Sequence, residues 1–392
     1  MAEKKTKQKK SGKKSDRITR RKQIAIATVV AVAVLCILVV ALVLANQKNG
    51  ADKEPVPSAS QEQTTVKTEQ TLASLEEPKQ IGPTNLLTGE PCDEATASKR
   101  PVAVMINNIY AAWPQYNTSQ ADIIYECEVE GGLTRLLAVY SDVEKVEDSI
   151  GSVRSAREYY LDFASNHDAL FVHAGGAESA YTALYEQGTD HLDGVNGGAE
   201  TNYYVRDPRR SGMAYEHRLC ISGPNVIAAA KARGLRTDAT AFENPMQFVS
   251  DGEDPVAQGN EATYVVTPFS ATTAYFTYDA ASKKYLRFEY NTAQTDGLNG
   301  EQLSFDNLIV LFCPYTNTGD SKGHITVDTL GSGDGYYINR GKYIPIHWNK
   351  TAHTAPISLK RADDGTALQM QTGKTFISVI NTASRDRVTM TQ

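Results

Sequence analysis

The sequence has few of the residues that usually mark a metal site. It contains five cysteines and seven histidines, and the histidines do not cluster at the spacings of metal ligands. Cys92, Cys127, Cys220 and Cys313 lie far apart and form no C-x-x-C pair. Outside the cytoplasm they could form disulfides, but a body of this size can bury a core without them. We therefore expect no bound metal, and we expect these four residues to be thiols within strands.

Familiar catalytic signatures are also missing. The chain has no G-x-S-x-G, no H-E-x-x-H and no P-loop sequence. The glycines of "GGAESAYTAL" lack the G-x-G-x-x-G of dinucleotide sites, and "DTLGSGDG" lacks the acidic pattern of an EF-hand loop. These absences argue against the common hydrolases, metalloproteases and nucleotide-dependent enzymes, and we expect no cofactor.

Charge is distributed unevenly along the chain. The formal net charge is −6, whereas residues 1–23 hold eleven Lys/Arg against two acids for a local +9, so the rest carries −15. An acidic body repels polyanions, and we expect no nucleic-acid partner. A basic tail in front of an apolar stretch instead predicts a membrane topology.

The longest apolar run occupies residues 24–45, which contain neither a charge nor a proline. At 1.5 Å per residue a helix of this length spans about 33 Å, enough to cross the hydrocarbon core of a membrane. A secretory signal is the alternative, but its apolar region is normally shorter and ends at an A-x-A-like cleavage site, which "ALVLANQ" lacks. We predict one transmembrane helix in the cell membrane, with residues 1–23 in the cytoplasm and the body outside it.

The rest of the chain divides into a linker and a two-part body. Residues 46–80 contain no aromatic residue and cannot bury enough apolar area to fold, so we expect a disordered linker. Hydrophobic periodicity and turn residues predict these elements in residues 81–240: strands at 101–107, 121–130, 134–140 and 169–176, and helices at about 152–166, 178–187 and 224–233. Residues 241–392 hold mainly strand-like segments rich in tyrosine. The expected fold is a layered α/β sandwich with a mixed sheet in two subdomains, of which the C-terminal one is mostly β.

Several stretches of this body occur in a familiar order. They are "RPVAVMINN", "PQYNTSQADIIYE", "EGGLTRLLAVY", "IGSVRSAREYY" and "FVHAGG", followed by "GSGDGYYINRGKYIPIHWNK" and "GKTFISVI". In these motifs the chain, over about residues 83–385, resembles the YerB-like family of bacterial envelope lipoproteins. The resemblance implies a bacterial, extracytoplasmic protein with a layered α/β fold in two subdomains. It implies no activity, because the function of that family is unknown.

Three arginines, Arg135, Arg154 and Arg157, lie close to predicted strand and helix ends. The spacing of Arg154 and Arg157 places both on one face of the predicted helix 152–166, near an N-terminus whose free N–H groups favour anions. They could therefore hold a phosphate or carboxylate bidentately. Alternatively, the three arginines pair with the three glutamates that alternate along residues 126–130, and "SARE" at 155–158 forms a capping box. The sequence leaves both interpretations open.

Four further polar residues could share a crevice with the arginines. Asn107, Glu130 and His173 end or follow predicted strands, which is where ligands of α/β sheets usually bind. His173 with Glu130 could serve in acid–base catalysis, although a lone histidine at a strand end is more often structural. His217, in "AYEHRLC", is a further candidate for ligand binding.

Two functions remain open from the sequence. The first is a membrane-tethered binding or scaffold protein of the cell envelope, whose ligand is an anionic envelope polymer, a peptidoglycan fragment or a partner protein. The second is an envelope hydrolase or transferase that acts on an anionic glycan or wall polymer. It would clamp the anion with Arg154 and Arg157 and use His173 and Glu130 for catalysis. The absence of a catalytic signature favours the binding protein.

Overall fold

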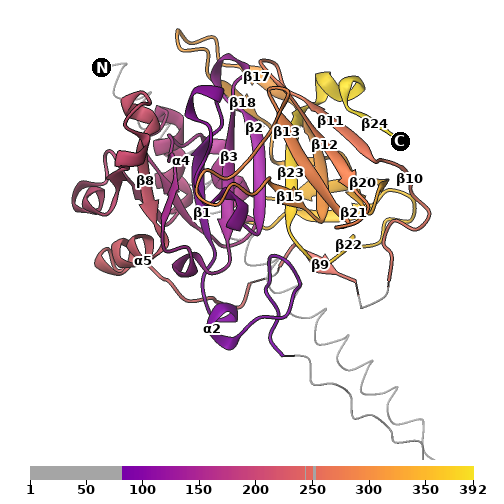
Figure 1. The fold of residues 1–392 in the computed structure, drawn as a ribbon, viewed down its shortest axis with the longest axis horizontal. Helices are drawn as coiled ribbons and strands as arrows, with labels where there is room; N and C mark the ends of the chain where they lie inside the picture. The colour runs from indigo at the N-terminus through magenta and orange to yellow at the C-terminus, as the bar shows by residue number, and fades with distance from the viewer. Residues whose placement is uncertain (1–81, 243, 250–252) are drawn as a thin grey trace, which may run out of the picture. The chain divides into compact units, whose positions relative to one another are not determined.

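The computed structural model describes residues 82–242, 244–249 and 253–392. The predicted transmembrane helix at 24–45 and the linker at 46–80 lie outside these ranges. Within them, no helix has the length and apolar character to cross a membrane. The described residues form two large sheets, three small ones and four α-helices, which confirms the mixed α/β fold in two parts (Figure 1).

The larger sheet contains eleven strands drawn from both halves of the chain. In spatial order they are β10 (Asn260–Glu261), β20 (Lys342–Lys350), β19 (Gly331–Asn339), β16 (Asn307–Cys313), β23 (Thr375–Asn381), β2 (Ile123–Glu128), β3 (Thr134–Tyr140), β1 (Val102–Asn107), β5 (Leu170–His173) and β6 (His191–Asp193), with β21 (Ser358–Arg361) beside β20. The halves meet where β2 and β23 run parallel, with Ile123 opposite Thr375. Figure 1 shows this junction as a magenta and a yellow strand side by side. One continuous sheet therefore joins the two parts.

The second large sheet comes from the C-terminal half. Its order is β14 (Thr292–Ala293), β13 (Lys284–Glu289), β12 (Thr273–Asp279), β11 (Tyr264–Pro268) and β24 (Thr389–Thr391), with β15 (Ser304–Phe305) beside β13. The small sheets are β4 (Ser149–Gly151), β8 (Leu219–Ser222) and β7 (Val205–Arg206); β17 (Tyr315–Asn317) and β18 (Ile325–Val327); and β22 (Gln369–Met370) and β9 (Gln247–Phe248).

Both faces of the larger sheet are buried, and this gives the body its layers. Along β1, Val102, Val104 and Ile106 face one core, while Ala103 and Met105 face the other. The first core lies against the second sheet and α5 (Gly223–Ala232), and the second lies against α3 (Glu158–Ser165) and α4 (Glu178–Gln187). The fourth helix, α2 (Glu94–Ala97), is a single turn. Burial on both faces explains why the central strands read as continuous apolar runs.

The predicted helix 152–166 begins six residues too early. The helix α3 starts at Glu158, and Arg157 is its N-cap residue without a side-chain cap hydrogen bond. The preceding residues are extended, because their main chain bonds to neighbouring strands: Arg154 N–H donates to the Met105 carbonyl at 2.9 Å, and Ala156 N–H to that of Gly175 at 2.9 Å. Tertiary pairing has overridden local helical propensity. The predicted capping box at 155–158 is therefore wrong, as is the shared helical face of Arg154 and Arg157.

Other local predictions fared better. The predicted strands at 121–130 and 134–140 are present as the antiparallel pair β2 and β3, and α4 and α5 lie within one residue of their predicted bounds. The alternation of glutamates ends early, because β2 stops at Glu128 and Glu130 begins a 3-10 turn, η3 (Glu130–Gly132). Among the described cysteines, all of which are free, Cys127, Cys220 and Cys313 are buried strand thiols, whereas Cys92 lies outside any strand.

Candidate functional site

All seven predicted site residues lie at or beside one end of the larger sheet. Asn107 ends β1 and pairs in register with Arg135 near the start of β3. The extended segment 152–157 passes over this end, held by hydrogen bonds from Asn107 N–H to Ser152 O (2.9 Å) and from Ala174 N–H to Arg154 O (3.0 Å). Because its main chain is fixed on both sides, the segment presents Arg154 and Arg157 from a rigid support.

Glu130 occupies the centre of the arginine cluster, by which we mean Arg135, Arg154 and Arg157. Its Oε1 accepts from Arg135 Nη2 at 3.1 Å and from Arg157 Nη2, and its Oε2 accepts from Arg157 Nε at 3.0 Å. Further bonds run from Arg135 Nη1 to Ser155 O and from Arg157 Nη1 to Ala156 O, at 2.5 and 2.7 Å. One carboxylate thus serves two guanidinium groups, in a bidentate geometry with Arg157.

The pKa values in the cluster reflect the presence of one carboxylate among three arginines. Burial by itself would raise the pKa of Glu130, but the hydrogen bond from Arg157 and the charges of Arg135 and Arg157 lower it to about 2. Burial, together with the charges of Arg157 and Arg154, lowers the pKa of Arg135 to about 10. With three guanidinium groups and one carboxylate, the cluster holds more positive charge than Glu130 neutralises.

Arg154 is the arginine without a partner. Its Nε is buried and has no hydrogen-bond acceptor within the described ranges, and its side chain forms no ion pair there. Burial lowers its pKa, and the nearby charges of Glu216 and Glu130 oppose that shift. The remaining glutamates of residues 126–130 are bonded elsewhere, so the prediction that three glutamates pair with the three arginines holds only for Glu130.

His217 joins the same end of the sheet through Asn107, whose side-chain amide nitrogen lies 3.0 Å from His217 Nδ1. The turn that carries His217 is held by the buried Arg210, which donates to three main-chain carbonyls, one of them that of His217 at 2.7 Å. Burial, followed by the charge of Arg154, lowers the pKa of His217. A neutral imidazole beside Arg154 can donate or accept one hydrogen bond to a ligand without adding charge.

His173 ends β5 at the same end of the sheet, but its side chain bonds to groups outside the arginine cluster. Its ring is buried, with Nδ1 2.8 Å from the Gly175 carbonyl and Nε2 2.9 Å from His191 Nδ1. Burial lowers its pKa, which keeps the ring neutral. Since both ring nitrogens have partners and Glu130 is engaged by arginines, His173 and Glu130 do not form the predicted acid–base pair.

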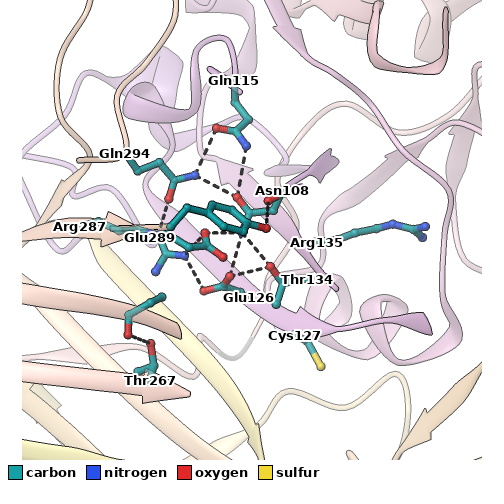
Figure 2. A network of polar contacts seen from close by, with 12 residues as sticks. Asn108, Gln115, Glu126, Cys127, Thr134, Arg135, Thr267, Arg287, Glu289 and Gln294 are labelled. Atoms are coloured by element: carbon teal, nitrogen blue, oxygen red, sulfur yellow. Dashed lines mark hydrogen bonds and ion pairs between the residues drawn. The ribbon is translucent and has the colours of Figure 1, made fainter. Parts of the chain in front are cut away.

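A buried polar network between the two halves was not predicted. Glu126 accepts from Arg287 Nη2 at 2.7 Å, and the same nitrogen lies 3.0 Å from Glu289. The network is completed by four uncharged side chains (Figure 2), namely Asn108, Gln115, Thr134 and Gln294. Figure 2 also shows Arg135 beside this network and pointing away from it. Local sequence could reveal only that Arg287 and Glu289 alternate on the same strand face as Tyr285 in "KYLRFEY".

The two carboxylates of this network share one guanidinium, and all three side chains are fully buried. Burial raises the pKa of Glu126. Burial, and after it the negative charge of Glu126, raises the pKa of Glu289 to about 8. Since no solvent reaches these groups, the network connects the halves and is not itself a ligand site. Glu128, on the same strand as Glu126, is bonded instead to Ser270, by N–H at 2.6 Å and by Oγ at 3.0 Å.

Comparisons with known proteins agree with this division of the chain into two parts. Residues 87–236 match the family model described as "Protein of unknown function (DUF3048) N-terminal domain", and residues 265–377 match that of the DUF3048 C-terminal domain. The chain belongs to the DUF3048 family. It is 26% identical over 302 residues to the Bacillus subtilis (strain 168) protein named "Putative lipoprotein YerB", a match that covers 75% of this chain and 85% of that one.

A solved structure shares the fold of this DUF3048 protein. The crystal structure of YerB from Bacillus subtilis superposes with a TM-score of 0.66 at 24% identity and covers 79% of this chain and 99% of that one. The resemblance expected from the motifs is thereby confirmed, while the roles of the candidate site residues stay predictions.

Proposed function

We propose that this DUF3048 protein is a membrane-tethered, extracytoplasmic binding protein whose arginine cluster holds an anionic group of a cell-envelope polymer. The apolar run at 24–45 behind a basic tail supports the tether and its orientation. A relative named as a lipoprotein supports a membrane-associated body, although in that protein the name indicates a lipid anchor.

The observation that carries the anion site is the excess of guanidinium groups over carboxylates. Glu130 engages Arg135 and Arg157, and Arg154 keeps a buried Nε without an acceptor. A buried donor without a partner costs about 1 to 3 kcal/mol, and a bound anion would remove that cost. Phosphate and carboxylate fit best, because both accept the paired hydrogen bonds of a guanidinium.

The geometry also supports binding without reorganisation. Glu130 and two main-chain carbonyls already fix Arg135 and Arg157, whose side chains are 7% and 6% exposed. An incoming anion would therefore order only Arg154, so that little side-chain entropy is lost on binding. Asn107 and His217 supply uncharged hydrogen-bonding groups beside Arg154.

The alternative of an envelope hydrolase or transferase finds less support. It requires an acid–base pair close to the anion clamp, and His173 and Glu130 are each bonded to other groups. The remaining titratable pair near the cluster is His217 and Glu216, whose Nε2 and Oε1 lie 4.0 Å apart, but Glu216 is exposed. Binding is therefore the function that we put forward.

The test compares Arg154→Gln with Arg340→Gln in the full-length protein in detergent micelles. Arg340 is a suitable control because it is also partly buried and forms no ion pair within the described ranges, but belongs to the turn between β19 and β20. With inorganic polyphosphate as the probe, we expect Arg154→Gln to weaken binding at least ~10-fold, the loss of about one charge-assisted hydrogen bond. Equal affinities of Arg154→Gln and wild type, measured by calorimetry, would refute the proposal.

A further inference from the structure

A cavity of about 430 Å³ opens in the C-terminal half beside the loop between β2 and β3. Its walls are the turn between β11 and β12 at residues 269–273, the turn residues Tyr290 and Asn291, and Arg387. The lining thus combines the hydroxyl-bearing residues Ser270, Thr272 and Thr273 with the aromatic residue Tyr290. Such a mixture of one apolar surface and several polar groups is typical of small-molecule sites.

Three aromatic residues from both halves meet at one side of the cavity, where Tyr290 lines the cavity and Tyr110 and Trp113 contact Tyr290. The ring of Tyr290 lies 5.4 Å from that of Tyr110 and 5.3 Å from that of Trp113, in edge-on contacts. Tyr110 is 63% exposed although it contacts both other rings. A large exposed aromatic side chain beside a cavity marks an interaction surface, and its ring combines an apolar face with a polar tip.

The charge of the cavity is positive at its outer edge. Arg387 is exposed and forms no ion pair with another described residue. Glu128, whose carboxylate feels the charge of Arg387, is buried and bonded to the N–H and hydroxyl of Ser270, and burial raises its pKa. An aromatic ring, several hydroxyls and one free cation together suit a sugar that carries, or lies next to, an anionic group.

The cavity and the arginine cluster are connected through one short segment, residues 128–132. At one end of it Glu128 binds Ser270, and at the other the Gly132 carbonyl accepts from Ala271 N–H at 3.1 Å. Between them, Glu130 binds Arg135 and Arg157. Arg387 of the cavity and the arginine cluster thus lie on either side of the same five residues. A ligand that contacts both must be longer than a single ion.

We propose that this cavity and the three aromatic residues beside it form a subsite for a sugar residue of an anionic glycan, the polymer whose charged group the arginine cluster holds. The inference rests on the proposed function and adds the chemical class of the ligand. The apolar face of the sugar ring packs against Tyr110 and Tyr290, its hydroxyls bond to the turn at residues 269–273, and Arg387 pairs with a neighbouring carboxylate or phosphate.

The experiment measures binding of three probes to the full-length protein in detergent micelles: polygalacturonate, which has sugar and charge; polyphosphate, which has charge alone; and dextran, which has sugar alone. The variants are Tyr110→Ala and Arg387→Gln. The control is Tyr185→Ala, because Tyr185 is 89% exposed on α4. We expect Tyr110→Ala to weaken polygalacturonate binding about 10-fold, as for loss of one aromatic contact, and to leave polyphosphate binding within about twofold of wild type.

The outcomes separate the two proposals. Unchanged polygalacturonate affinity in both Tyr110→Ala and Arg387→Gln would overturn the glycan subsite, as would dextran binding as tight as that of polygalacturonate. Loss of polygalacturonate binding in Tyr110→Ala alone supports the stacking contact, and loss in both variants supports the whole subsite. Unchanged polyphosphate binding in Arg154→Gln instead overturns the anion site of the arginine cluster, whatever the Tyr110 variant does.

Discussion

Replacing Glu130 by glutamine removes the one carboxylate that holds two buried arginines together. The pKa of Glu130 falls from an ordinary 4.5 to about 2, which corresponds to roughly 3 kcal/mol of interaction with the folded state. Its side chain is 28% exposed, so screening by solvent reduces this to about 2 kcal/mol. The substitution also leaves Arg135 and Arg157 buried without a counter-ion, and breaking a buried pair typically costs 3 to 5 kcal/mol. We expect a net loss of about 3 kcal/mol.

Thermal unfolding at two pH values measures this loss. At pH 7 the melting temperature of Glu130→Gln should lie about 5 °C below wild type, while Glu186→Gln, which alters an exposed residue of α4, should leave it unchanged. Because the pKa of Glu130 is lower in the folded state, its contribution is complete above about pH 4.5 and is lost as the pH falls towards 2. A variant that melts within about 1 °C of wild type at pH 7 would contradict the reasoning, and so would a difference that persists unchanged at pH 2.

The same variant connects stability with binding. In wild type, the negative charge of Glu130 lies beside the guanidinium groups that would attract a bound anion. Removal of the carboxylate should therefore increase the affinity for polyphosphate. The anion would then replace the missing charge and raise the melting temperature of Glu130→Gln by more than that of wild type. An equal shift in both proteins would mean that the anion binds away from Glu130.

Three further predictions concern groups outside the cluster. Glu289→Gln should remove a pH dependence: the pKa of Glu289 is raised to about 8, so the folded protein keeps this carboxyl protonated up to about pH 8, whereas the unfolded chain ionises it above about pH 4.5. The contribution of Glu289 to stability is therefore complete below about pH 4.5 and is lost as the pH rises towards 8. Urea unfolding in steps from pH 5 to 8 should show wild type losing stability relative to the variant, and parallel profiles would contradict this. Arg210→Gln should destabilise by several kcal/mol, because three main-chain carbonyls lose their buried donor, whereas Arg154→Gln should not lower the melting temperature, because it breaks no hydrogen bond among the described residues. Cys127, Cys220 and Cys313 should resist thiol reagents in the native protein and react after unfolding, since burial raises the pKa of each thiol; rapid native labelling would contradict their burial.

The sequence predicted the elements whose pattern is local. The strands of the first half and the helices α4 and α5 carry clear periodicity and end signals, such as Pro224 within the first turn of α5 and Gly234 after its end. The same approach gave a wrong prediction for residues 152–157, which are extended and not helical. They have helix-compatible composition, but the main-chain bonds that hold them extended come from residues distant in sequence, namely those near Met105, Gly175 and Leu219. No local pattern contains that information.

The sequence predicted which residues lie together in the candidate site better than it predicted which of them form ion pairs. The rule that functional groups gather where strands end placed Asn107, Glu130 and the three arginines together, because it depends only on strand direction. It could not show which acid meets which arginine. Glu126 and Glu128 lie on the same strand and resemble Glu130 in sequence, yet they bond to Arg287 and Ser270 of the other half. Such pairing depends on how the two sheets pack, which the alternation of residues does not specify.

The pairing across the halves bears on how the two proposed subsites could act together. Glu126 and Glu128 leave the arginine cluster because the C-terminal half supplies Arg287 and Ser270 as partners. Had all three glutamates remained available, the three arginines would be neutralised and an anion would gain nothing by binding. The junction of the halves thus does two things at once: it fixes the segment 128–132 between the cavity and the cluster, and it leaves Arg154 without a carboxylate. Any substitution that loosens the junction should therefore weaken anion binding even where it touches no arginine of the cluster.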